Sequence, residues 1–259
     1  MSEAIVFTSG KGGVGKPTVL ANVRVGLSQL DKKVVMLDTD MGLRNLDLVM
    51  GLENRINYNI LDLLDNRCRL KQALIRDKRY PNLYLIPAAT KYRNLSGYTE
   101  KFKTLIECLK KEFDYCLIDC PAGMDDGFNF AISAADRAVV VTTPHISAVR
   151  DAGRILYLLE YNNFNKVDLV INEYDKHMVR RNEVISQNDI EELLSTKASG
   201  VIPYDKKIII SQNQGIPVIS LRAKVNTHFN KLTNRLNRLE IVAKKSEKLA
   251  VKGECVNET

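Results

Sequence analysis

The sequence has no tryptophan, only three histidines, and five cysteines scattered along 259 residues. The cysteine count is odd and no C-x-x-C pair occurs, which is typical of reduced thiols rather than of a disulfide framework. Cys116 and Cys120 are too sparse for a metal site, and His145, His177 and His228 do not cluster. Zinc binding and Cys–His catalysis therefore have no support in the sequence.

Long apolar runs are also missing. The longest have strand length, such as Ala138–Val141 and Ile208–Ile210, far below the about 18 residues of a membrane span. Hydrophobic residues still make up 45% of the chain, enough for a large core, which excludes global disorder. The length fits one large domain, and the first strand begins so close to Met1 that we expect no targeting leader.

The net charge of +7 is spread unevenly. Residues 222–259 hold nine Lys or Arg against four Asp or Glu, so the rest of the chain is nearly neutral. This argues against a nucleic-acid surface over the whole body and indicates a local basic segment, with a solvated terminal helix as the alternative. We expect a single domain over residues 1–243 and a basic tail over residues 244–259 that is either disordered or in contact with a membrane.

Strand-length apolar runs alternate with helix-length segments. We expect strands at residues 4–8, 33–38, 83–87, 115–119, 138–142, 167–172 and 200–203. We expect helices at residues 18–30, 59–64, 70–75, 100–111, 128–135, 148–160, 189–194 and 226–243. This alternation predicts an α/β fold, a mostly parallel twisted sheet with helices on both faces. Ligands in such folds bind at the carboxyl ends of the strands.

A phosphate-binding loop follows the first expected strand. It reads Gly10-Lys11-Gly12-Gly13-Val14-Gly15-Lys16, which fits G-x-x-x-x-G-K. Its glycines let backbone N–H groups converge on phosphate oxygens, and Lys16 is expected to reach the β- and γ-phosphates. Because the run stands between a strand and a helix, an incidental glycine-rich turn is the weaker interpretation. Residues 10–18 form the candidate nucleotide-binding segment.

The residue after the loop lysine departs from the usual pattern. A phosphate loop normally continues with Ser or Thr, whose hydroxyl binds Mg²⁺, whereas this chain has Pro17 and then Thr18. Pro17 offers neither a hydroxyl nor an N–H, and it disfavours helical backbone at Lys16, although proline is tolerated in a first helical turn. Thr18 is expected to point elsewhere, since successive helical residues are about 100° apart. Our hypothesis is weakened Mg²⁺-nucleotide binding and slow or absent hydrolysis.

With its second lysine, Lys11, the loop reads K-G-G-V-G-K and resembles that of the deviant Walker A ATPases, the ParA/MinD family. The resemblance covers nearly the whole body, and it includes Asp38-Thr39-Asp40, the run G-L-R-N-L-D at residues 42–47 and Leu117–Gly123. It implies ATP and Mg²⁺ as cofactors, ATP hydrolysis, and a homodimer in which Lys11 reaches phosphates across an ATP-filled interface.

The same resemblance implies roles for individual residues. Lys11, Lys16 and Asp40 would be catalytic, with Asp40 orienting the attacking water, and Asp38 and Asp119 would stand near Mg²⁺. A turn or helix-cap role is the alternative for each aspartate, and it stays open for Asp38. Contacts to a partner or a second copy would involve Arg44, Asn45 and Asp151.

Asn172 ends a late strand where this family often has Asn-Arg near adenine, but here the next residue is Glu173. Its amide suits the adenine edge, and capping or turn formation is the alternative.

The run G-L-R-N-L-D resembles the septum-site-determining group of the family. This implies a spatial regulator of cell or plastid division that attaches to a membrane as an ATP-bound dimer, with MinE-like and MinC-like partners. The expected location is the cytoplasm or plastid stroma, at the inner membrane face when ATP is bound. Abundant Asn, Ile and Lys fit an AT-rich genome such as a plastid's.

The C-terminal segment leaves two interpretations open. An apolar stripe of Leu232, Leu236, Leu239, Ile241 and Val242 is surrounded by basic residues, with no aromatic residue beyond Phe229. Such a helix either lies on an anionic membrane or packs on the domain.

Two alternative functions differ in class. One is a nucleotide-binding interaction module that no longer hydrolyses ATP because of Pro17. The other is a ParA-like DNA-segregation ATPase, which predicts salt-sensitive DNA binding; the nearly neutral body and the G-L-R-N-L-D run count against it.

Overall fold

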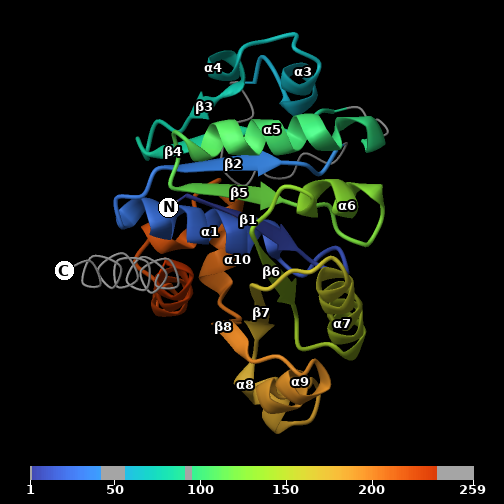
Figure 1. The fold of residues 1–259 in the computed structure, drawn as a ribbon. Coiled ribbons are helices and arrows are strands. Elements are labelled where there is room, and N and C mark those ends of the chain that lie inside the picture. Colours follow the sequence, from blue (N-terminus) through green and yellow to red (C-terminus); the bar gives the residue numbers. More distant parts are fainter. Residues whose placement is uncertain (1, 42–55, 91–94, 238–259) are drawn as a thin grey trace, which may run out of the picture.

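The computed structural model describes residues 2–41, 56–90 and 95–237, and these form an eight-stranded sheet covered by helices (Figure 1). The strand order is β3-β4-β2-β5-β1-β6-β7-β8. The strands are β1 (Glu3–Thr8), β2 (Val34–Asp38), β3 (Ile75–Arg76), β4 (Leu83–Ile86), β5 (Tyr115–Asp119), β6 (Arg137–Thr142), β7 (Val167–Tyr174) and β8 (Ala198–Pro203).

All pairings are parallel except that of β3 with β4, so the expected α/β fold with a mostly parallel sheet is confirmed. The central strands β2, β5 and β6 are buried along their whole length. Continuous apolar runs such as those in β5 and β6 can be buried on both faces only when helices cover both sides of the sheet.

The helices form two layers. They are α1 (Lys16–Gln29), α3 (Ile60–Leu64), α4 (Leu70–Ala73), α5 (Thr99–Lys110), α6 (Asp126–Ile132), α7 (Ile146–Tyr161), α8 (Lys176–Arg180), α9 (Gln187–Leu193) and α10 (Lys206–Asn213). One core packs α1 and the helical segment at residues 226–237 against one face of the sheet; a second core packs α5, α6 and α7 against the other. In Figure 1, α5 and α1 lie on opposite sides of β2 and β5.

Several expected elements differ in detail. The edge strand β3 and the helices α8 and α10 are absent from the sequence-based assignment, and the helix expected at 70–75 ends at Ala73. The apolar run Ile208–Ile210 lies inside α10, because Asp205 caps the N-terminus and accepts a hydrogen bond from the Lys207 N–H at 2.9 Å. The helix expected at 226–243 is helical over 226–237; the boundary at 243 and the tail lie outside the described residues.

The last described helical turn is held by a buried ion pair. Arg137 at the start of β6 donates through Nε to Asp168 at 2.6 Å and through Nη1 to the Leu236 carbonyl at 3.0 Å. Ser199 donates to the other carboxylate oxygen of Asp168. The Arg137–Asp168 pair therefore joins β6, β7 and β8 to the end of the helical segment. No helix in the described part of the chain combines the length and apolar character needed to span a bilayer.

Candidate functional site

The glycine-rich loop joins β1 to α1 and needs glycine at specific points. Gly15 caps α1 with a φ of 80°, and Gly13 has a φ of 84°, both in the left-handed region. A Cβ atom at Gly10 would lie 2.5 Å from the main chain of Asp151, so the loop rests directly on α7. Cβ atoms at Gly12 and Gly13, in contrast, would meet no other described atom within 4 Å. The crown of the loop is therefore open.

The Asn172 side chain holds the glycine-rich loop by a hydrogen bond to its main chain. This buried side chain lies in β7, two residues before the strand ends at Tyr174 and not at the expected end; it donates through Nδ2 to the Val14 carbonyl at 2.9 Å, and a Cβ atom at Gly15 would overlap it. Its Oδ1 is buried and accepts no hydrogen bond within the described part of the chain. The structure thus gives Asn172 a role in positioning the loop. Its contact with adenine stays a prediction.

Lys16 and three aspartates meet at the carboxyl ends of β2 and β5. Asp38 and Asp119 are register partners in these neighbouring strands, and Lys16 Nζ makes a buried ion pair with Asp119. The Asp40 N–H donates to Asp38 Oδ1 at 2.9 Å, which orders the chain beyond β2. The structure therefore brings together the residues that the sequence analysis selected for phosphate, metal and water.

The electrostatics of this cluster follow from burial. Burial and the neighbouring Asp119 carboxylate raise the pKa of Asp38 to about 8. Burial opposes charging of Lys16, but the contact with Asp119 outweighs it and raises the pKa of the ammonium. Burial also raises the pKa of Asp40, with the Lys16 charge acting in the opposite direction. The cluster thus contains the Lys16–Asp119 ion pair and two further carboxyl groups whose ionisation a bound cation would favour.

Pro17 does not displace Lys16 from the helix, which corrects the expected effect on its backbone. Helix α1 begins at Lys16, with the proline in its first turn, where no intrahelical N–H bond is lost. Thr18 is buried, and its hydroxyl accepts a hydrogen bond from Gln212 of α10. Thr18 is therefore tied to α10, and no hydroxyl stands at position 17 itself.

Lys11 lies at the rim of the loop. Its side chain is exposed, and its Nζ donates to the Ser147 hydroxyl in the first turn of α7 at 3.4 Å. Asp151, one turn further along α7, lies against Gly10 and pairs with Arg154 at 3.5 Å. Arg44 and Asn45 lie outside the described residues.

ATP and Mg²⁺ fit the groups present. The open crown of the loop, the cationic Lys16 and the unpartnered Asn172 Oδ1 suit a nucleotide. No group of three or more His, Cys, Asp or Glu side chains in the described ranges could hold a metal alone. Asp38 and Asp119 would therefore hold Mg²⁺ only together with water and nucleotide phosphates, as is usual for this ion.

Two contacting residues escaped the sequence analysis. Ser147 meets Lys11, and Gln212 meets Thr18, across 136 and 194 residues of sequence respectively. Ser147 carries one usable signal, since it follows β6 at the start of α7, where ligands of parallel sheets gather. Gln212 carries none, because it lies in a helix that the sequence did not indicate.

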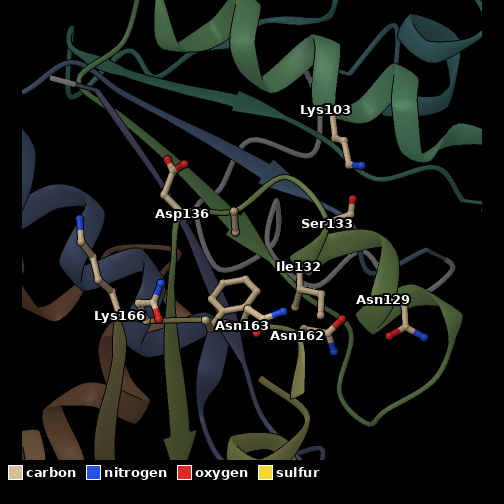
Figure 2. Close-up of a pocket in the computed structure, with 11 residues that line it drawn as sticks. Lys103, Asn129, Ile132, Ser133, Asp136, Asn162, Asn163 and Lys166 are labelled. Atoms are coloured by element: carbon tan, nitrogen blue, oxygen red, sulfur yellow. The ribbon is translucent and has the colours of Figure 1, made fainter. Parts of the chain in front are cut away.

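A polar cavity of about 590 Å³ lies at the amino ends of the strands, opposite the end that carries the loop (Figure 2). It is lined by Asn129 in the middle of α6, by Ser133 just after that helix, and by Asn162 and Asn163 just after α7. Asp136 and Lys166, also in its wall, precede β6 and β7. The cavity is therefore at the amino ends of the strands, away from the loop.

The comparisons with known proteins agree with this geometry. The family model described as AAA domain matches residues 2–173. The septum site-determining protein MinD of Synechocystis is 47% identical over 240 residues, covering 93% of this chain and 90% of that protein. MinD of Bacillus subtilis is 48% identical over 220 residues, covering 84% of this chain and 82% of that protein. The putative septum site-determining protein MinD of Guillardia theta is 49% identical over 219 residues, covering 85% of this chain and 81% of that protein.

Solved structures match over the whole described fold. MinD in the MinC:MinD complex of Aquifex aeolicus superimposes with a TM-score of 0.84 at 39% identity, covering 91% of this chain and 96% of that one. MinD of Pyrococcus horikoshii, complexed with Mg-ADP, superimposes with a TM-score of 0.82 at 29% identity, covering 93% of this chain and 98% of that one. Fold and site define a P-loop ATPase of the deviant Walker A class. Within that class, the chain belongs to the MinD family of septum site-determining proteins.

Proposed function

We propose that this MinD-family ATPase directs placement of the division septum by switching between an ADP-bound monomer and an ATP-bound homodimer attached to a membrane. Its relatives are septum site-determining proteins, which favours this function over DNA segregation and over a module without hydrolysis. The proposed location is the inner face of the membrane that encloses the cytoplasm or plastid stroma.

The observation that carries the proposal is the contrast between the two loop lysines. Lys16 is buried and already paired with Asp119 in its own chain. Lys11 is exposed at the open rim of the loop and has one long hydrogen bond to Ser147. A lysine placed in this way is free to reach the phosphates of a nucleotide held by a second copy.

The residues divide the chemistry among them. Backbone N–H groups of the loop and the N-terminus of α1 hold the phosphates. The Lys16 ammonium exchanges its contact with Asp119 for a contact with these phosphates. Asp40, half-buried beyond β2, accepts a hydrogen bond from the attacking water. Bound Mg²⁺ would neutralise charge on the phosphates beside Asp38 and Asp119.

Helix α7 is the surface that we propose for partners. It begins at the loop rim, where Asp151 lies against Gly10, and its outer side exposes Tyr157 and Tyr161 to 67% and 77%. A partner on this face contacts the helix that also carries Ser147, next to Lys11. The MinC:MinD complex of Aquifex aeolicus supports a MinC-like partner, and we extend the proposal to a MinE-like one.

Co-sedimentation with anionic vesicles tests the switch. We expect the protein to pellet with Mg²⁺-ATP and to stay in solution with Mg²⁺-ADP. Lys11→Ala is expected to remain soluble in both states while it still binds nucleotide, because it keeps Lys16 and the loop. No pelleting of the unaltered protein in either state would overturn the membrane part of the proposal.

A further inference from the structure

One stretch of the chain carries basic residues without intervening acidic ones in the sequence. Between residues 206 and 237 the sequence has six Lys or Arg and no Asp or Glu. All six are exposed: Lys206, Lys207, Arg222, Lys224, Lys231 and Arg235. We call this surface the basic face. Its nearest acidic residue in sequence is Asp205, which is engaged as the cap of α10.

Contacts show that the parts of the basic face adjoin one another. Lys207 Nζ donates to the Arg222 carbonyl at 2.9 Å, which joins α10 to the segment before the last helix. Asn226 donates to the Leu221 carbonyl at 2.6 Å, which fixes the start of that helix. Arg79, from the turn before β4, donates to the Gly215 carbonyl at 2.8 Å and pairs with the buried Asp77 at 3.4 Å, so it borders the face without adding an unpaired charge. The charges therefore gather on the side of the sheet that α1 covers.

The basic face also exposes apolar side chains. Ile209 and Ile210 of α10 are 47% and 53% exposed, while their neighbour Ile208 packs on the core. Two adjacent exposed isoleucines beside Lys206 and Lys207 gain nothing from a surface that offers only phosphates. They fit the boundary between lipid headgroups and acyl chains, where cations meet phosphate and apolar groups enter the bilayer.

We propose that the basic face is itself a membrane-binding surface for anionic phospholipid. It belongs to the folded body and is distinct from the tail beyond residue 243. The proposal deepens the membrane part of the proposed function. It gives the body a fixed orientation, with α10 and the helical segment at residues 226–237 toward the bilayer. The opposite layer of α5 and α6 then faces away from it.

Vesicle co-sedimentation of full-length variants tests this surface. Lys224→Gln/Lys231→Gln removes two charges from the face, and Ile209→Ser/Ile210→Ser removes its apolar part. Lys101→Gln/Lys111→Gln is the matched control, because both lysines are exposed on α5 or at its end, on the other layer. Vesicles of phosphatidylglycerol and phosphatidylcholine are compared with pure phosphatidylcholine, in Mg²⁺-ATP and in Mg²⁺-ADP.

We expect each neutralised lysine of the face to lower binding to phosphatidylglycerol vesicles roughly fivefold. The isoleucine variant should also bind more weakly, and the α5 control should match the unaltered protein. If Lys224→Gln/Lys231→Gln does not fold, as judged by circular dichroism, Lys206→Gln/Lys207→Gln takes its place.

Equal binding by the charge variant and the α5 control overturns the proposal. So does loss of duplex DNA binding in the charge variant with vesicle binding unchanged, since the partner is then a nucleic acid. The two proposals fail separately. If the charge variant still pellets with vesicles in ATP but not in ADP, the nucleotide switch is supported and the basic face is not a membrane-binding surface. If the unaltered protein pellets equally in ATP and ADP and the charge variant does not pellet, the basic face is supported and the nucleotide switch is contradicted.

Discussion

At the scale of single residues, Pro17 is the largest departure from a working phosphate loop. It leaves α1 and Lys16 in place, so the damage is confined to the missing hydroxyl and the missing N–H at that position. Thr18 does not replace either group, because its hydroxyl is bonded to Gln212.

Restoring the hydroxyl should therefore strengthen Mg²⁺ binding. We expect Pro17→Thr to raise Mg²⁺-dependent ATP affinity by about tenfold or more, because even groups that only orient metal ligands change affinity by about that much. We also expect it to raise the hydrolysis rate. Pro17→Ala restores only the N–H and separates the two contributions. Titration calorimetry and phosphate release measure both. Equal values for Pro17→Thr and the unaltered protein would refute the hypothesis.

Asp38 predicts a pH dependence of stability in the absence of nucleotide and metal. Its pKa is about 8 in the folded protein and about 4 in an unfolded chain. Between these values the folded state keeps a proton that the unfolded state loses. This contribution to stability is present below about pH 4 and is lost as the pH rises to about 8.

Urea denaturation across this range measures the effect. Asp38→Asn should flatten the fall in unfolding free energy, which cannot exceed about 1.4 kcal/mol per pH unit for one group. The same substitution at exposed Asp31 serves as the control. An unchanged slope in Asp38→Asn would show that the group is already ionised.

The residues of the loop could be predicted because their requirements are local. Gly13 and Gly15 need positive φ within a seven-residue run, and Lys16 follows at once. The bond from Asn172 to Val14 spans 158 residues and depends on how β7 is placed beside the loop. Its residue type was identified from the strand end, but its positioning role could come only from the three-dimensional arrangement.

At the scale of elements, the length of a strand or helix decides whether its sequence pattern can predict it. The strands β1, β5 and β6 are continuous apolar runs, and their positions were predicted closely. The two residues of β3 are too few to form a pattern, and they pair because β4 offers an open edge. In α10 the β-branched run Ile208–Ile210 favours a strand locally, and the Asp205 cap and packing of Ile208 override that preference.

The ion pair that anchors the helical segment at residues 226–237 gives a prediction at this scale. Arg137→Leu leaves Asp168 buried without its partner and should lower the unfolding free energy by about 3–5 kcal/mol. Arg137→Leu/Asp168→Leu should recover much of that loss. Lys103→Ala, which breaks an exposed pair with Glu100, should cost less than about 1 kcal/mol. Similar losses for Arg137→Leu and Lys103→Ala in urea denaturation would contradict the anchor.

At the scale of the whole molecule, the proposed dimer makes activity depend on concentration. Among the described residues, Lys11 Nζ has a hydrogen bond only to Ser147, and in the proposed dimer it contacts the phosphates of the nucleotide that the second copy holds. We expect ATPase activity per molecule to rise with protein concentration and then to level off. Lys11→Ala should show a low and constant value. A rate per molecule that is independent of concentration in the unaltered protein would contradict assembly across the nucleotide.

The two margins of the sheet restrict how copies can join. In the sheet that the structure describes, one margin is β3, only two residues long and antiparallel to its neighbour. The other is β8, which ends at Pro203 and pairs with register shifts. Short, irregular or proline-containing margins are poor templates for strand addition by another chain. These two margins therefore disfavour growth into continuous fibrils along the described sheet. The dimer that we propose would form instead at the carboxyl ends of the strands, beside the nucleotide-binding loop.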